Sequence, residues 1–133
     1  MSVVFLDTVG LLAQWDRSDQ WHAAARRAYQ EFVERGDRTV STTFVFLECG
    51  NAAARRPYRG LVAQTRKAME ASGRLVTPRT EDWETAWAAY GNAGATGAGI
   101  VDHVSFAGMR RLGITDAFTN DRHFRTAGFN VLF

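Results

Sequence analysis

Short apolar runs alternate along the chain with longer segments whose apolar residues recur at helical spacing. The runs Ser2–Leu6 and Ala117–Asn120 are apolar or β-branched, which is typical of strands buried on both faces of a sheet. Weaker runs at Asp37–Ser41, Arg74–Thr77 and Phe129–Phe133 are expected to form strands as well. Because these runs alternate with helical segments, the pattern predicts a parallel sheet covered by helices.

The segments between the strands predict helices with one apolar face. In the segment Gln20–Glu34, Trp21 and three further apolar residues share a face and are expected in the core. Trp83 and Trp87, which share a face with Tyr90 in a later helix, are also expected there. The remaining predicted helices are Val9–Trp15 (capped by Thr8), Phe44–Arg56 (capped by Thr42 or Thr43), Tyr58–Ser72, a helix opening near Asp102, and His123–Thr126. We therefore predict a three-layer α/β/α domain with four or five short strands, a single domain over residues 1–133.

Composition is that of a globular protein, with 46% hydrophobic and 23% charged residues. The first apolar run is too short for a signal peptide or a membrane span, so we expect no membrane contact. Cys49 is the single cysteine, which cannot form an internal disulfide. We expect it to pack as a small apolar residue in a reducing compartment, the cytoplasm.

Four acids are predicted to meet at one edge of the sheet. Asp7 and Asp121 each follow a strand, Glu48 lies early in the helix after the second strand, and Asp102 opens the helix that leads to the fourth. The carboxyl ends of parallel strands share an edge, where ligands bind. Carboxylates this close repel one another unless a cation neutralises them, and oxygen ligands without cysteines favour Mg²⁺ or Mn²⁺ over zinc.

Asp116 belongs to the same stretch as Asp121 but is left out of this set. It starts the fourth strand, so five residues of strand place it about 16 Å from Asp121, at the opposite edge. Each remaining acid, taken alone, has a simpler interpretation as a helix cap or a solvated charge. The simpler interpretation weakens when separate segments deliver acids to one edge.

Four motifs in order resemble the PIN-domain ribonucleases, and within them the small toxins of toxin–antitoxin pairs. The resemblance covers nearly the whole chain. The motifs are VVFLDTVGLL around Asp7, TTFVFLECGNAAAR around Glu48, DHVSF from Asp102, and TNDRHF, which contains Asp121. The chain departs from the family at Gly91–Gly99, GNAGATGAG, where many members carry polar or acidic residues and an aromatic.

The resemblance implies a Mg²⁺- or Mn²⁺-dependent endoribonuclease. Asp7, Glu48, Asp102 and Asp121 would bind the metal, which activates water and leaves a product with a 5′ phosphate. It also implies RNA as the substrate, a cognate antitoxin protein as partner, and a homodimer.

Clustered arginines suit a surface that holds an RNA backbone, although solvated helix faces explain them equally well. The clusters are Arg26-Arg27, Arg55-Arg56 with Arg59, Arg110-Arg111, and Arg122 with Arg125. Three polar residues lie near the acids in the sequence, Thr8, Thr119 and His123. We expect the two threonines mainly to form capping and turn hydrogen bonds, and His123 to have no role in the chemistry. Trp15, beside a polar break, is the tryptophan expected to be exposed.

Two alternatives stay open. A non-catalytic PIN-like module would bind RNA or protein without cleaving it, although an intact set of acids argues against it. A receiver-like domain also gathers acids at a sheet edge, but it usually has an acidic pair after the first strand and a lysine after a late one. Here the first strand ends in a lone Asp7, and the fourth leads to Asp121.

Overall fold

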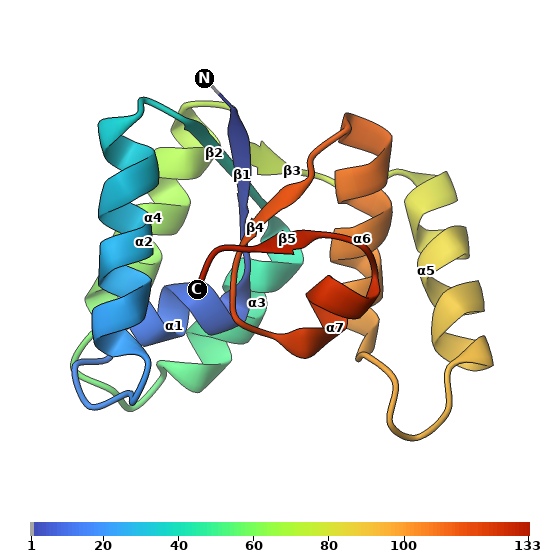
Figure 1. Ribbon diagram of the computed structural model, residues 1–133, viewed down its shortest axis with the longest axis horizontal. Helices are drawn as coiled ribbons and strands as arrows, with labels where there is room; N and C mark the ends of the chain where they lie inside the picture. The colour runs from blue at the N-terminus through green and yellow to red at the C-terminus, as the bar shows by residue number, and fades with distance from the viewer. Residues whose placement is uncertain (1) are drawn as a thin grey trace.

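Five parallel strands form the centre of the computed structural model, which describes residues 2–133 (Figure 1). Their order in the sheet is β3-β2-β1-β4-β5, and every neighbouring pair is parallel. Phe5 of β1 aligns with Val40 of β2 on one side and with Ala117 of β4 on the other. The strands are β1 (Val3–Leu6), β2 (Arg38–Thr42), β3 (Leu75–Val76), β4 (Asp116–Phe118) and β5 (Asn130–Val131).

Helices lie on both sides of this sheet, so the predicted three-layer α/β/α fold is confirmed. In Figure 1, α2 and α4 flank one side, α6 flanks the other, and α5 lies outside α6. None of the helices within residues 2–133 is long and apolar enough to cross a membrane. The helices are α1 (Thr8–Trp15), α2 (His22–Glu34), α3 (Thr43–Ala52), α4 (Arg59–Ala71), α5 (Thr80–Asn92), α6 (Ile100–Leu112) and α7 (Arg122–Thr126).

The strand order places a topological switch beside β1. The chain builds β2 and β3 on one side of β1, then returns to form β4 and β5 on the other. In open α/β sheets such a switch leaves a crevice at the carboxyl ends of the two strands, and ligands bind there. The receiver-like alternative is disfavoured, because flavodoxin-like domains order their strands 2-1-3-4-5.

Aromatic side chains fill the core next to this switch. Phe32 of α2 contacts Phe118 of β4 edge to face, with ring centroids 5.5 Å apart, and both side chains are fully buried. Gly10 lets α1 approach the end of β4, because a Cβ at that position would overlap the carbonyl group of Phe118. The end of β4 is therefore fixed closely against the helix that follows β1.

The expected positions of three aromatic residues are wrong. Trp21 precedes the first residue of α2 and is 48% exposed, so helical spacing does not place it in the core. Trp87 is 54% exposed and meets the ring of the exposed Tyr90 edge to face instead. Trp15, expected to be exposed, packs against the core. Spacing along a helix shows which residues share a face but not whether that face is covered.

Helix ends also differ from the prediction in two places. Asp7, not Thr8, caps α1, and its carboxylate accepts a hydrogen bond from the Val9 N–H. The third helix ends at Ala52 rather than Arg56, whose guanidinium pairs with Asp16 in the α1–α2 connection. Asp7 therefore has a structural role as well as its predicted place at the sheet edge.

Candidate active site

The four predicted acids come from four separate elements near the switch. Asp7 directly follows β1, and Asp121 caps α7 three residues after β4 ends. Asp102 lies in the first turn of α6, and Glu48 lies in the middle of α3. Asp7 is buried, whereas Glu48 is exposed, so the group runs from the interior to the surface.

Asp7 is the buried member of the group. Its side chain is 1% exposed, and burial, followed by the charge of Asp102, raises its pKa from 3.8 to about 7. Hydrogen bonds from Thr119 and from the backbone of Thr8 and Val9 oppose this rise but do not cancel it. At neutral pH the fold therefore holds a carboxyl group that resists ionisation.

Asp102 and Cys49 show that the other acids are nearby. Burial, followed by the charges of Asp121 and Glu48, raises the pKa of Asp102 from 3.8 to about 6, and His123 opposes this rise. The pKa of Cys49 rises to about 12 because the thiol is buried close to Asp7 and Glu48. Asp102 is thus within electrostatic reach of each of the other three carboxylates. Cys49 itself is fully buried, as predicted.

Two threonines connect the acids. The Thr119 hydroxyl donates to Asp7 Oδ2 at 2.9 Å and accepts a hydrogen bond from the Asp121 N–H at 3.1 Å. The Thr8 hydroxyl donates to Glu48 Oε1 at 2.7 Å, although the two residues are 40 positions apart. Sequence reasoning treated both threonines as local capping groups and missed these long-range bonds. The signal available was a threonine beside an acid in two of the four motifs.

The four acids offer the oxygen ligands that suit a hard divalent cation, but they are not arranged as a complete coordination site. None of the four acids forms an ion pair with Lys, Arg or His within residues 2–133. The four acids therefore lack an ion-pair partner in this part of the chain, and carboxylate oxygens are the ligands that Mg²⁺ and Mn²⁺ prefer. Among the described residues no three His, Cys, Asp or Glu side chains sit close enough to form a ready metal-binding group.

Asp116 is the first residue of β4, at the end of the strand away from the four acids, as its place in the sequence predicts. Its carboxylate accepts a hydrogen bond from the Asn130 side chain at 3.0 Å. It therefore serves the junction between β4 and β5, and it provides a matched control for Asp121 and Asp7.

Several of the clustered arginines are occupied by contacts within the protein. Arg111 binds the buried carboxylate of Asp82, and Arg56 binds Asp16. Arg110 donates to the Ala127 carbonyl and lies over the Phe129 ring, 5.3 Å from its centroid. These clusters are thus at least partly structural, whereas Arg122 makes no ion pair within residues 2–133.

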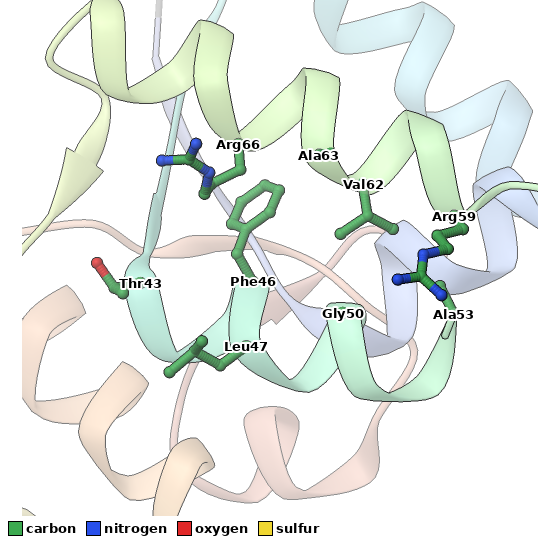
Figure 2. Close-up of a pocket in the computed structure, with 9 residues that line it drawn as sticks. All are labelled: Thr43, Phe46, Leu47, Gly50, Ala53, Arg59, Val62, Ala63 and Arg66. Carbon is green, nitrogen blue, oxygen red and sulfur yellow. The ribbon is translucent and has the colours of Figure 1, made fainter. Parts of the chain in front are cut away.

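A groove with a volume of about 270 Å³ lies between α3 and α4. Figure 2 shows Phe46 and Val62 between two arginines, Arg59 and Arg66, which lie toward opposite ends. Leu47, on the α3 side, is 59% exposed. The groove is therefore apolar along its length and basic at its ends.

Comparison with known proteins gives a match in structure. No protein-family model matches the chain, and no curated protein sequence matches it. Among solved structures, it superposes on the Mycobacterium tuberculosis toxin VapC20, described as a toxin that cleaves the Sarcin-Ricin loop. The TM-score is 0.79, with 25% sequence identity over 96% of each chain. The chain therefore has the fold of a PIN-domain toxin, and the resemblance that its four motifs indicated is confirmed.

Proposed function

We propose that this chain is a metal-dependent endoribonuclease and the toxin of a toxin–antitoxin pair. The observation that carries the proposal is the convergence of four acids, without cationic partners in the described chain, at the switch of a PIN-like sheet. The fold shared with an RNA-cleaving toxin supports the same reaction class. Mg²⁺ or Mn²⁺ is the cofactor proposed, with Asp7, Glu48, Asp102 and Asp121 as its ligands.

The reaction is hydrolysis of an RNA phosphodiester. Water attacks phosphorus, the bond from phosphorus to the 3′ oxygen breaks, and the 3′ oxygen leaves with a proton. The products carry a 5′ phosphate and a 3′ hydroxyl. Asp7, Glu48, Asp102 and Asp121 would hold the Mg²⁺, which would supply Lewis-acid activation of the water and stabilise charge on the leaving oxygen. No protein nucleophile is required.

The chain's own residues set the conditions for this chemistry. Thr119 holds the Asp7 carboxylate and the Asp121 backbone together, and Thr8 fixes the direction of the Glu48 side chain. Asp7 and Asp102 must lose their protons to bind a cation, and their raised pKa values place that loss near neutral pH. Metal binding is therefore expected to release protons below about pH 7.

The α3–α4 groove is the surface that we propose for the antitoxin. Its apolar length between Phe46 and Val62 suits the apolar face of a short helix. Arg59, which forms no ion pair in the described chain, favours an acidic residue at one end of such a helix, whereas Arg66 at the other end pairs with Glu70 of α4. A cytoplasmic location, where both RNA and the antitoxin occur, fits this role. The expected homodimer stays a prediction.

The proposed activity requires both metal and Asp7. Purified wild-type protein should cleave RNA in Mg²⁺ or Mn²⁺ and stop in EDTA, and Asp7→Asn should lower the rate by at least about a hundredfold. Asp116→Asn is the matched control and should retain the wild-type rate. Denaturing gels of an end-labelled RNA give the measurement. Equal cleavage in EDTA would exclude the metal mechanism, and RNA binding without turnover would favour the non-catalytic module.

Removing the Asp7 charge should stabilise the metal-free protein in a pH-dependent way. The pKa of Asp7 is raised in the folded state, so its carboxyl destabilises the fold once the unfolded chain ionises. This penalty is absent below about pH 4, grows as pH rises, and is complete above about pH 7. In EDTA at pH 8, the free energy of unfolding of Asp7→Asn should exceed that of the wild type by about 2–4 kcal/mol. Urea unfolding followed by circular dichroism measures this, and a less stable variant at pH 8 would contradict it.

Filling the α3–α4 groove should leave the toxicity intact but prevent the antitoxin from neutralising it. Ala63→Trp, an exposed groove position on α4, should still arrest growth when expressed, but the cognate antitoxin should no longer rescue the cells. Ala23→Trp, an exposed alanine on α2 outside the groove, is the control and should be rescued normally. Growth curves with and without antitoxin expression give the result. Equal rescue of both variants would remove the groove from the interface.

A further inference from the structure

A hollow of about 720 Å³ lies between α6, α7 and the loop that joins α5 to α6. We call it the α6–α7 pocket. His103 and Phe106 of α6 line it, together with Arg122 and His123 of α7 and Thr96 of the loop. Its volume is within the range of about 300–1,000 Å³ that small-molecule sites occupy. The small residues of the loop, where the chain departs from its family, leave this space open.

The pocket combines three kinds of surface. Arg122 is exposed and makes no ion pair within the described part of the chain, so its guanidinium is available to an anion. Phe106 and Ala127 contribute apolar wall. The Nε2 atom of His103 is buried and has no hydrogen-bond partner among residues 2–133. Buried polar atoms are normally satisfied, so this nitrogen is suited to a ligand group or a bound water.

The pocket adjoins the acids in both sequence and space. Arg122 and His123 directly follow Asp121, and His103 directly follows Asp102. The charge of His123 also acts on the Asp102 carboxylate, which shows that the two side chains are near each other. A chain of RNA with one phosphodiester at the acids would therefore place a neighbouring nucleotide at or near the pocket.

We propose that the α6–α7 pocket holds one nucleotide of the RNA next to the bond that is cut, with Arg122 on a phosphate and His103 on the base edge. The proposal deepens the function proposed above and rests on it. Guanidinium groups match phosphate oxygens, and single-stranded RNA is recognised through splayed bases held against aromatic and apolar walls. An unpaired ring nitrogen beside an apolar wall and a free cation suits a ligand that is both planar and anionic.

Binding can be measured apart from cleavage by working in an Asp7→Asn background. Fluorescence anisotropy with a fluorescein-labelled single-stranded RNA of mixed sequence, in Mg²⁺, gives the dissociation constant. Adding Arg122→Gln should weaken binding about tenfold. Arg38→Gln removes the same charge at the start of β2, at the opposite edge of the sheet, and should weaken it by less than about twofold. Equal effects of the two substitutions would overturn the proposal.

A second pair of variants tests the open volume of the α6–α7 pocket rather than the charge of Arg122. Thr96→Trp fills the pocket from the loop and should weaken RNA binding about tenfold, whereas Ala95→Trp, its neighbour outside the pocket, should not. Both positions are exposed, and circular dichroism checks that each variant folds. Unchanged binding by Thr96→Trp would overturn the proposal. The assay measures RNA binding by a variant that does not cleave RNA. A failure of the wild-type protein to cleave RNA would therefore contradict the proposed function without deciding whether the pocket binds a nucleotide.

Discussion

Repulsion among carboxylates at one edge of the sheet is the constraint on which the rest of the structure depends. Asp7 and Asp102 both have pKa values raised by burial and by neighbouring acids. An arrangement of this kind lowers the stability of the metal-free protein and is maintained only because the surrounding fold determines it. A cation bound there would neutralise the carboxylates, and relief of their repulsion would favour its binding. Stability and function are therefore expected to oppose each other at Asp7.

The fold holds the acids by fixing the backbone close to each of them. Asp7 and Asp121 cap the helices that follow their strands, so neither can move without disturbing a helix start. Thr119 adds a hydrogen bond that joins these two segments across the switch between β1 and β4. The close approach of α1 to β4 at Gly10 supports the same junction. Glu48, held by Thr8 but exposed, is the acid with the most freedom to move toward a ligand.

The sequence was sufficient to predict the elements whose signal is local and to place the acids at one edge. A buried strand followed by an acid has few interpretations, and parallel strands bring such ends together. It was insufficient where burial depends on what packs against a face, as the exposed Trp87 and the packed Trp15 show. The Thr8–Glu48 bond and the α6–α7 pocket depend on contacts between distant segments, which periodicity does not encode.

The central claim is that the acids form one cation site, and anomalous diffraction from crystals soaked in Mn²⁺ tests it most directly. We expect an anomalous peak bonded to carboxylate oxygens of Asp7 and Asp102, with Asp121 and Glu48 bound directly or through water. The same soak of Asp7→Asn crystals should weaken or remove the peak. The absence of a peak among these acids at saturating Mn²⁺, with or without a strong peak elsewhere, would show that they do not form a cation site.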